Sequence, residues 1–339
     1  MKALVTGATG FLGSHIAERL VKRGDSVRAL VRATSDTSFL ESLGDVELVE
    51  GDVTAARSLG AAVEGVDVIY HAAAMVSDWA PWRDFQSVTI NGTRNMLKAA
   101  VAAGVPRFLH VSSDAVYRYQ DLRHGVTEES PMETRFGPLD YYRRSKTAAE
   151  KIARRFQAKS NLAVSIVRPA LILGERDAAM LPGLIAFLKS PSAAYMGNGR
   201  NVLPCVHASD VAELCILAAT RDIAAGETYN AVNPEHVTQR DLLDTVAEIV
   251  GIAPPKRSIP FRAIYAIAIA LEAAARTRGW SHRPDLTRFS ANLIGIDYIE
   301  SASKAMRDLG WQPQVTRREA VRRSVEYARS HRRVQPVSG

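Results

Sequence analysis

A glycine-rich segment near the N-terminus, Thr6–Gly13 (TGATGFLG), constrains the fold of this chain more than any other feature. It follows the short apolar run Ala3–Val5 and precedes apolar residues at helical spacing, namely Ile16, Ala17, Leu20 and Val21. Glycine allows a tight turn and lets the backbone approach a pyrophosphate, which the free N–H groups of a helix N-terminus then bind. The order of strand, turn and helix therefore predicts a dinucleotide site that includes Thr6, Gly7, Thr9, Gly10, Phe11, Leu12 and Gly13. The alternative is an ordinary strand–turn–helix corner.

Short apolar runs and helical patterns alternate through the first half of the chain. The runs lie at 27–31, 46–49, 66–70, 108–111 and 164–167, with helical patterns clearest over 91–103 and 148–156. Such alternation predicts an α/β fold, a doubly wound parallel sheet of the Rossmann type with helices on both faces. Ligands of these sheets bind beyond the carboxyl ends of the strands, so the residues that follow each run are the candidate site.

The second half of the chain has a looser pattern, marked by proline and glycine from Gly174 onward. A chain of 339 residues exceeds the usual size of one hydrophobic core, so a smaller second lobe is expected. In that lobe a helix is predicted to begin at Thr238 and end at Gly251. We expect a dinucleotide-binding domain over 1–174 with 205–232 returning to it, a mainly substrate-binding lobe over 175–330, and a basic flexible tail over 331–339.

The composition is that of a soluble globular protein, with 47% hydrophobic and 23% charged residues. Two cysteines, Cys205 and Cys215, make no disulfide framework and lack the spacing of metal ligands, so we expect a reducing compartment and no metal. Met1 leads directly into the first predicted strand, and no apolar run reaches the roughly 18–20 residues that span a bilayer. These features predict a cytoplasmic protein without a signal peptide or a membrane-spanning segment.

The formal net charge is +7, and much of the excess lies in Arg317, Arg318, Arg322, Arg323, Arg329, Arg332 and Arg333. We interpret these arginines as a solvated helix face, with attraction to an anionic lipid or another polyanion as the alternative. No nucleic-acid partner is expected, because no aromatic interleaving or nucleic-acid motif accompanies the charge.

The segment 261–271 is predicted to be a helix that is apolar nearly all round. We expect it to be buried; contact with a hydrophobic substrate or a membrane surface is the alternative.

The residues after the second strand bear on the choice of nicotinamide cofactor. Val31 stands where an acidic residue would hold the adenosine ribose, and Arg32 follows it. A carboxylate favours a free 2′-hydroxyl, whereas an arginine pairs with a 2′-phosphate. Arg32 therefore favours NADP(H). NAD(H), with Asp36 on its ribose, is the alternative.

Two further segments at strand ends are candidate cofactor contacts. Asp52 and Val53 follow the next run and are predicted to border the adenine, with Asp52 accepting from its amino group. A helix N-cap for the following segment is the alternative for Asp52. Ala72, Ala73 and Ala74 follow the run at 66–70, and their small side chains allow close approach of a cofactor.

A tyrosine and a lysine four residues apart, Tyr142 and Lys146, share one face of a predicted helix. An unperturbed tyrosine has a pKa of about 10 and exchanges protons poorly at neutral pH. The neighbouring ammonium is expected to lower the pKa of Tyr142 toward the working range and to hold the nicotinamide ribose. A surface pair on an amphipathic helix is the alternative, which the combination with Ser113 and the glycine turn disfavours.

At this point the chain resembles an extended short-chain dehydrogenase/reductase, of the NAD-dependent epimerase/dehydratase superfamily, nearly from end to end. The matching segments are Thr6–Gly13, Asn91–Asn95 (NGTRN), Ser112–Tyr117 (SSDAVY), Tyr142–Lys146 (YRRSK), Arg168-Pro169 and Val206–Ala212.

The resemblance implies roles for individual residues. Tyr142 would be the general acid/base, with Lys146 adjusting its pKa and anchoring the ribose. Ser113 would polarise the reacting carbonyl or alcohol, and Asn91 would hold a proton-relay water; a helix cap is the alternative for Asn91. Ser113 is chosen by its distance from Val116, and Ser112 stays as the second choice and as a cofactor contact. Pro169 is also expected to contact the cofactor.

Two departures separate the chain from the sugar-nucleotide enzymes of this family. Leu203 stands where those enzymes usually carry an arginine that grips a diphosphate, and Ala115 stands where the dehydratases carry a glutamate. The pattern Gly197-x-Gly199-x-Asn201 and the segment 304–313 resemble instead the branch of the 3β-hydroxysteroid dehydrogenases and dihydroflavonol-reductase-like proteins.

The resemblance therefore implies an NAD(P)-dependent oxidoreductase that interconverts a secondary alcohol and a ketone on a hydrophobic substrate, sterol-like or another polycyclic or alkyl compound. One alternative is a nucleotide-sugar epimerase or dehydratase that keeps NAD bound, and another is a non-catalytic NADP-sensing module. Relatives commonly dimerise through the helices that correspond to 91–103 and 142–156, so a homodimer is expected. The residues leave open the substrate, the direction of the reaction and any contact of 261–271 with a membrane.

Overall fold

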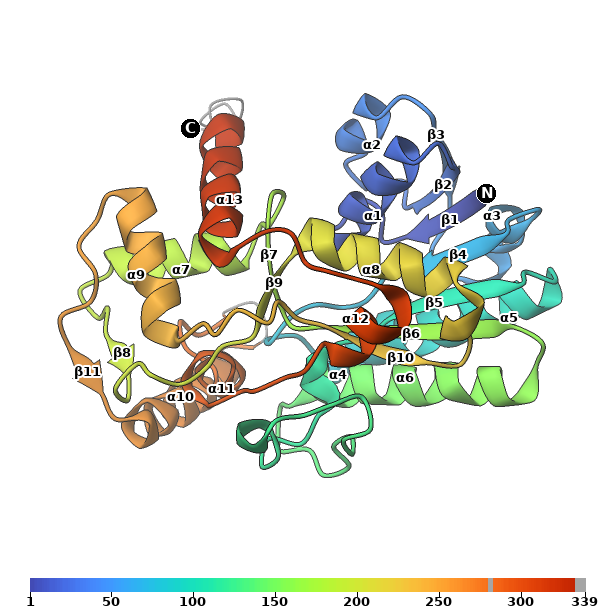
Figure 1. Cartoon of the computed structure of the whole chain (residues 1–339). Coiled ribbons are helices and arrows are strands. Elements are labelled where there is room, and N and C mark those ends of the chain that lie inside the picture. The colour runs from blue at the N-terminus through green and yellow to red at the C-terminus, as the bar shows by residue number, and fades with distance from the viewer. Residues whose placement is uncertain (280–282, 333–339) are drawn as a thin grey trace.

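The computed structural model describes residues 1–279 and 283–332, and its centre is a seven-stranded parallel sheet (Figure 1). The strand order is β10-β6-β5-β4-β1-β2-β3. The strands are β1 (Lys2–Thr6), β2 (Ser26–Val31), β3 (Val46–Glu50), β4 (Val68–His71), β5 (Arg107–Val111), β6 (Ala163–Pro169) and β10 (Thr228–Ala231). Val5 of β1 is in register with Ala29 of β2 on one side and Tyr70 of β4 on the other. The order reverses at β1, so the carboxyl ends of β1 and β4 form the switch point at which such folds bind ligands.

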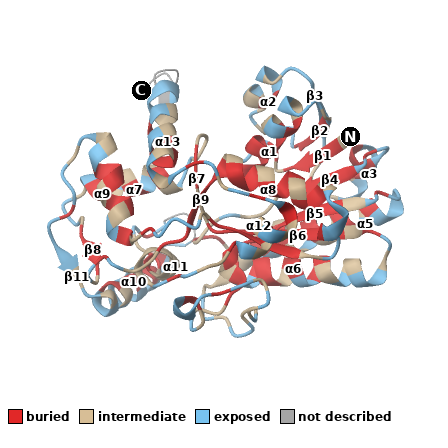
Figure 2. Ribbon diagram, viewed as in Figure 1, coloured by how far each residue is buried: buried red, intermediate tan, exposed pale blue. Residues whose placement is uncertain are grey.

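Alternating residues of the strands face two hydrophobic cores, as the two-residue period of a strand requires. Ala3 and Val5 pack on one side with α1 (Phe11–Lys22), α2 (Ser38–Ser42), α8 (Ala208–Thr220) and α12 (Ser303–Leu309). Leu4 packs on the other side with α3 (Gly60–Val63), α5 (Gly92–Ala102) and α6 (Tyr141–Lys159). Buried residues are concentrated along the sheet and the helix faces that cover it (Figure 2). The predicted doubly wound α/β sheet is confirmed.

The helix that contains Asn91 begins earlier than the sequence indicates. α4 (Trp82–Asp84) leads into a π-helical segment, η2 (Phe85–Asn91), which runs into α5 without a break. Asn91 has helical dihedral angles, and its side chain makes no capping hydrogen bond. The interpretation of Asn91 as a cap is therefore wrong, because the helix is already formed before this residue.

The remaining elements lie mainly in the second half of the chain. α7 (Met180–Lys189), α9 (Gln239–Val250) and α13 (Arg317–Arg332) share a third hydrophobic core. Two short parallel pairs join β7 (Leu171–Leu173) to β9 (Cys205–His207) and β8 (Tyr195–Met196) to β11 (Ser258–Ile259). Four 3-10 turns, η1 (Ala56–Ser58), η3 (Asp114–Val116), η4 (Leu122–His124) and η5 (Asp222–Ala224), connect longer elements. Thr238 and Asp241 form a capping box before α9, and Gly251 ends that helix at a φ of 81°, so the predicted helix is confirmed.

α10 (Phe261–Arg276) is not buried, and this expectation is wrong. Only Ile264, Ala268, Glu272 and Ala275 are buried, along the stripe that packs on α11 (Arg288–Gly295) and β8. Most of the remaining residues of the helix are exposed. Within the described ranges, no helix has both the length and the apolar character that crossing a membrane requires.

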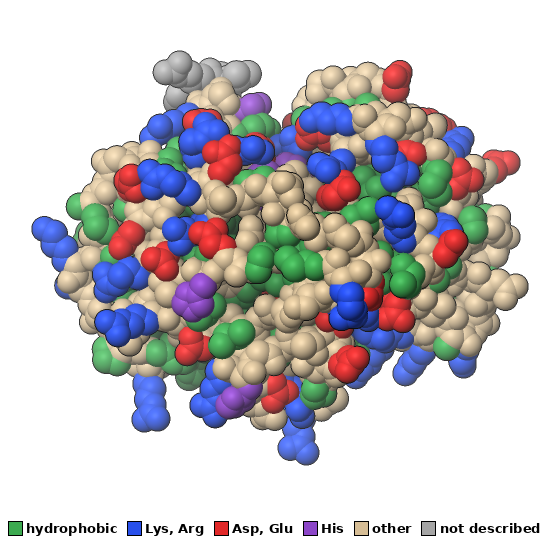
Figure 3. Space-filling model, in the orientation of Figure 1, with side chains coloured by type: hydrophobic (Ala, Val, Ile, Leu, Met, Phe, Trp, Pro, Cys, Tyr) green, Lys and Arg blue, Asp and Glu red, His purple; other side chains and the backbone are tan. Residues whose placement is uncertain are grey.

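The C-terminal arginines lie on a helix face supplied with carboxylates. Arg318 pairs with Glu248 of α9, and Arg322 pairs with Glu319 and Glu326 of α13 itself. Basic and acidic side chains are interspersed over the visible face of the molecule (Figure 3). The pairs agree with the interpretation as a solvated helix face. Arg333 and the rest of the predicted tail up to 339 lie outside the described residues.

A buried ion pair connects α6 with β6. Arg168 donates to both carboxylate oxygens of Glu150, at 3.0 and 2.6 Å, and the two side chains are 1% and 0% exposed. Ser112 and Arg154 also donate to this carboxylate. Burial alone would raise the pKa of Glu150, but Arg168, Arg154 and Ser112 together lower it to about 2.

We expect Arg168→Leu to lower the free energy of unfolding by roughly 3–5 kcal/mol, because it leaves a buried carboxylate without its main partner. Arg154→Leu is the matched control. It removes a guanidinium from the same carboxylate, but Arg154 is 39% exposed, and a loss of about 1 kcal/mol or less is expected. Urea denaturation followed by circular dichroism measures both, and an equal loss in the two variants would contradict the assigned role of the buried pair.

Candidate active site

The glycine turn after β1 packs directly against the residues that follow β4. Gly7 has a φ of 69°, and a Cβ atom built on it would lie 2.8 Å from the amide nitrogen of Ala73. A Cβ atom on Gly13 would lie 2.0 Å from the carbonyl oxygen of Gly7. Thr6 accepts a hydrogen bond from the Ala73 amide at 3.3 Å. The structure therefore places the predicted segments 6–13 and 72–74 side by side, at a distance that only glycine allows.

The N-terminus of α1 opens directly from this turn. Gly10 is the N-cap residue, and no side-chain hydrogen bond caps the helix there. The amide of Gly10 is bound to the Gly7 carbonyl at 2.9 Å, and intrahelical bonding begins with Ser14, which donates to Gly10. The first N–H groups of α1, those of Phe11 and Leu12 among them, are thus available to an anion.

At the end of β2 the two candidates for the adenosine ribose differ in their surroundings. Arg32 is exposed directly after Val31. The carboxylate of Asp36 accepts hydrogen bonds from both the hydroxyl and the amide of Ser38, at 2.6 and 3.0 Å, and these bonds lower its pKa. Asp36 is therefore already used as an acceptor at the start of α2.

Asp52 and Val53 shape the turn after β3. The carboxylate of Asp52 accepts from the amide of Thr54 at 2.7 Å, which fixes the turn. Val53 is buried, and a Cβ atom on Gly92 would lie 2.8 Å from its side chain. The carbonyl of Val53 also accepts from Asn95 of α5 at 2.9 Å. Ala55, not Asp52, is the N-cap residue of the following turn η1, so the interpretation of Asp52 as a cap is wrong, because its carboxylate is used within the turn. Its contact with an adenine stays a prediction.

Ser113, at the end of β5, and Tyr142, on the first turn of α6, come together. The side chain of Ser113 lies beside the phenol of Tyr142 and lowers its pKa. It donates to the carboxylate of Asp114 at 3.1 Å and accepts from the amide of Ala115 at 3.2 Å. Arg143, next to the tyrosine, donates to the carbonyl oxygens of Ala115 and Tyr117. One turn of α6 therefore carries both the phenol and the guanidinium that holds the segment after Ser113 in place.

Lys146 lies one turn further along α6 and is buried. Its ammonium donates to the carbonyl of Val111 at 3.0 Å, and burial lowers its pKa to about 8, against the opposing charge of Glu150. The expected lowering of the pKa of Tyr142 is not found. Burial raises it to about 12, and only the neighbouring Ser113 hydroxyl acts in the other direction. The desolvation of the phenol outweighs any influence of an ammonium that is bound to the main chain.

The two neighbouring serines face different partners. Ser112 donates to Glu150 at 2.7 Å, whereas Ser113 contacts Tyr142. Glu150 follows Lys146 by four residues, so the same helical spacing that pointed to Tyr142 and Lys146 could have indicated it. Pro169 ends β6 in register with Ala231 of β10, at the same edge of the sheet.

Asn91 is not brought together with these residues. Its side chain is exposed and accepts a hydrogen bond from Arg94 at 2.5 Å. The buried polar residue of the π-helical segment is Thr89, whose hydroxyl accepts from the amide of Met75 at 2.9 Å. The widened helix turns Thr89 inward toward the segment after β4 and turns Asn91 outward, and the sequence carries no visible signal for that turn.

The second half of the chain contributes residues that sequence reasoning missed. The ring of Phe289, on α11, meets the ring of Tyr142 edge-on at a centroid distance of 5.5 Å. The hydroxyl of Tyr298 donates to the carbonyl of Asp114 at 2.9 Å. Asp78, in the loop after β4, accepts two hydrogen bonds from Arg283 at 2.7 and 2.6 Å. Such contacts depend on how the lobe packs on the sheet, which no local pattern reveals.

Two buried carboxyl groups lie beside the serine. Burial raises the pKa of Asp114 to about 7, against hydrogen bonds from Ser113 and Ala115 and the charge of Arg143. Burial and the charge of Asp114 raise the pKa of Glu300, whose carboxylate oxygens have no hydrogen-bond partner within the described part of the chain.

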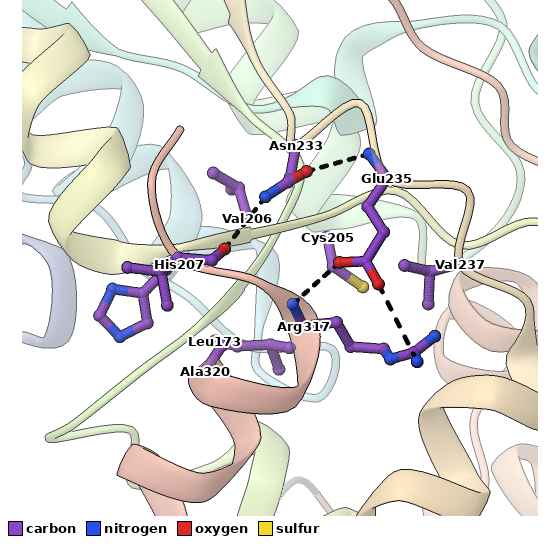
Figure 4. Close-up of a pocket in the computed structure, with 10 residues that line it drawn as sticks. Leu173, Cys205, Val206, His207, Asn233, Glu235, Val237, Arg317 and Ala320 are labelled. Atoms are coloured by element: carbon purple, nitrogen blue, oxygen red, sulfur yellow. Dashed lines mark hydrogen bonds and ion pairs between the residues drawn. The ribbon is translucent and has the colours of Figure 1, made fainter. Parts of the chain in front are cut away.

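A separate pocket lies between β7, β9 and the start of α13 (Figure 4). Its lining does not include Ser113 or Tyr142. Arg317 pairs with Glu235 within the pocket, and His207 accepts from the amide of Ser209 outside it, at the start of α8. Across residues 1–279 and 283–332, no three His, Cys, Asp or Glu side chains gather as metal ligands would.

Comparisons with known proteins agree with this geometry. The NAD dependent epimerase/dehydratase family matches residues 3–231. A ketoreductase from Stigmatella aurantiaca, named for 4-hydroxy-2-methyl-3-oxo-4-farnesyl-3,4-dihydroquinoline-1-oxide, is 32% identical over 321 residues, which cover 95% of each chain. Sterol demethylase protein B from Methylococcus capsulatus is also 32% identical, over 94% of this chain and 95% of that protein.

A solved structure extends the likeness to the whole fold. A double mutant of the dTDP-glucose 4,6-dehydratase DesIV from Streptomyces venezuelae, crystallised with NAD, has a TM-score of 0.76 and 26% identity over 98% of both chains. The family match covers more than half of this chain, and the relatives align with it over almost its whole length. The chain therefore belongs to the NAD dependent epimerase/dehydratase family, as an NAD-dependent enzyme of the extended short-chain dehydrogenase/reductase group.

Proposed function

We propose that the protein is an NADP(H)-dependent oxidoreductase that interconverts a secondary alcohol and a ketone on a hydrophobic substrate. The observation that carries the proposal is the contact between Ser113 and the Tyr142 phenol, one helical turn from Lys146. These residues lie at the same sheet edge as the glycine turn. The bound nicotinamide would supply or accept the hydride.

The protonation states suit reduction of a ketone. With a pKa raised to about 12, the Tyr142 phenol keeps its proton at neutral pH and can give it to the forming alkoxide. Ser113 would hold the carbonyl oxygen beside that phenol, and Lys146 would hold the nicotinamide ribose. Proton transfer of this kind contributes roughly 10²–10⁴-fold to a rate.

The remaining predicted cofactor contacts form a path along the sheet edge. The glycine turn would bind the pyrophosphate, and Ala72, Ala73 and Ala74 would border the cofactor beside it. Ser112 and Pro169 would lie near the nicotinamide end. Asp52 and Val53 would border the adenine, and Arg32 would bind the 2′-phosphate.

A hydrophobic substrate is supported by the surroundings of the phenol, because the apolar ring of Phe289 covers one side of Tyr142. Leu203, at the position of the diphosphate-binding arginine, is buried in an apolar core and is unsuited to a sugar nucleotide. The two relatives are named for a farnesylated quinoline oxide and for sterol demethylation.

The proposal extends to assembly and location. α5 and α6 lie side by side on one face of the sheet, and their outer faces would form a homodimer interface. The cysteines Cys205 and Cys215 are free and buried, which fits a cytoplasmic location.

Replacement of Tyr142 by Phe should abolish turnover and spare cofactor binding. The expected loss in kcat is about 10²-fold or more, because the proton donor is removed, with the Kd for NADPH within about threefold of wild type. A substrate is first identified by screening the wild type against sterol-like, flavonoid-like and sugar-nucleotide compounds. Tyr141→Phe is the control, since the Tyr141 ring packs against Trp82 and Phe85 instead. Retained activity in the Tyr142 variant would refute the proposed general acid.

Replacement of Arg32 by Glu should change the choice of cofactor. Loss of the pairing with a 2′-phosphate is expected to raise the Kd for NADPH by about 10–100-fold and to leave that for NADH within about threefold. Fluorescence titration measures both. Arg83→Glu, which alters an exposed charge on α4, should change neither value. Equal effects on the two cofactors would contradict the role of Arg32.

The pH dependence of reduction should report on Asp114. Below a pH of about 7 this carboxyl group is protonated, and above it the carboxylate draws the Ser113 proton away from the substrate oxygen. We expect kcat/KM for reduction to fall by about threefold or more between pH 6 and 8, and Asp114→Asn to remove the step near pH 7. A decline near pH 8 would stay, because Lys146 loses its charge there. Identical profiles for the two proteins would rule out this effect.

A further inference from the structure

The outward face of α10 is apolar from Ala263 to Ala274. Ile267, Ile269 and Leu271 are 49%, 47% and 38% exposed. Five exposed alanines lie between them on the helix surface, namely Ala263, Ala266, Ala270, Ala273 and Ala274. At 100° per residue, this apolar surface extends about 200° around a helix about 24 Å long. An exposed apolar surface of this extent marks a site of interaction.

Basic residues stand at both ends of this face. Arg262 lies in the first turn of α10, Arg276 in the last, and Arg278 just beyond, and all three are exposed. Ion pairs within the described residues engage none of them. The single carboxylate of the helix, Glu272, is buried and accepts from the Arg288 guanidinium at 2.6 Å. A basic side chain projects at the lower left of Figure 3, in the region where Figure 1 shows α10.

This charge pattern distinguishes between two binding partners for the apolar face, a second copy of this chain and a lipid surface. In a two-fold contact between copies of this chain, antiparallel α10 helices would bring Arg262 of one copy against Arg276 of the other, and like charges would repel. An anionic lipid surface has the complementary charge and is flat and apolar below its headgroups. Arginines that border an apolar helix face are the pattern of helices that lie in the membrane interface.

We propose that α10 docks the protein on the surface of membranes that contain anionic lipids, with Ile267, Ile269 and Leu271 inserted below the headgroups. α11 connects the docked helix to the candidate active site. Glu272 is bound to Arg288 at the start of α11, and the next residue, Phe289, contacts the ring of Tyr142. The docking does not depend on the reaction proposed above and is tested without measuring activity.

The test is flotation of the full chain with vesicles of phosphatidylcholine alone or with one third phosphatidylglycerol, at low and high salt. Ile267→Glu with Leu271→Glu places two carboxylates on the docking face. Ile223→Glu is the matched control, because Ile223 is 62% exposed on the separate turn η5. Arg262→Gln with Arg276→Gln tests the charges alone. NADPH affinity and the melting temperature of every variant show that the fold is intact.

We expect the wild type and the Ile223 variant to bind anionic vesicles about tenfold more strongly than neutral ones, and high salt to weaken this binding. The double glutamate variant should lose it by about tenfold or more. The arginine variant should bind both vesicles alike. Wild-type binding to anionic vesicles no stronger than that of the folded double glutamate variant would overturn the proposal. So would light scattering in which the glutamates dissociate an oligomer, since a second copy would then cover α10.

Discussion

The arrangement of the site depends on one buried carboxylate. Glu150 of α6 accepts hydrogen bonds from Ser112 at the end of β5, from Arg168 on β6, and from Arg154, which in turn reaches Thr228 of β10. A charge without solvent is tolerated only where it is fully paired, so its partners fix how α6 is rotated and how far it is shifted along the sheet. Tyr142 and Lys146 lie on the same helix, and their positions against the ends of the strands follow from that constraint.

Features that depend on short-range backbone and spacing preferences could be predicted from the sequence. The glycine turn was predictable because only glycine fits the approach of Gly13 to the Gly7 carbonyl. Helical spacing paired Tyr142 with Lys146, and the family pattern that ends at Val116 and Tyr117 selected Ser113. The helix from Thr238 to Gly251 was marked at both ends by residues with specific backbone preferences. In each case the relevant partners are a few residues apart or lie at neighbouring strand ends.

Properties that depend on packing between distant segments were not predictable. The pKa of Tyr142 follows from how completely the phenol is removed from water, and a ring from α11 contributes to that burial. The exposure of α10 was missed because an alanine-rich helix has the same composition whether it is buried or open. Asn91 was assigned by motif, but its orientation depends on the type of helix in which it sits.

The π-helical segment Phe85–Asn91 limits which sequence changes the helix of η2 and α5 can accept. Such a wide turn holds one residue more than a regular α-helix needs for the same length, and it is retained mainly where it serves a purpose. Loss of a single residue there would restore regular winding and rotate the preceding stretch by about 100° relative to α5. Thr89 would then leave Met75, and Trp82 and Phe85 would leave the ring of Tyr141. The length of this segment therefore sets the rotation of the preceding residues relative to α5, and a deletion there would be more damaging than a substitution.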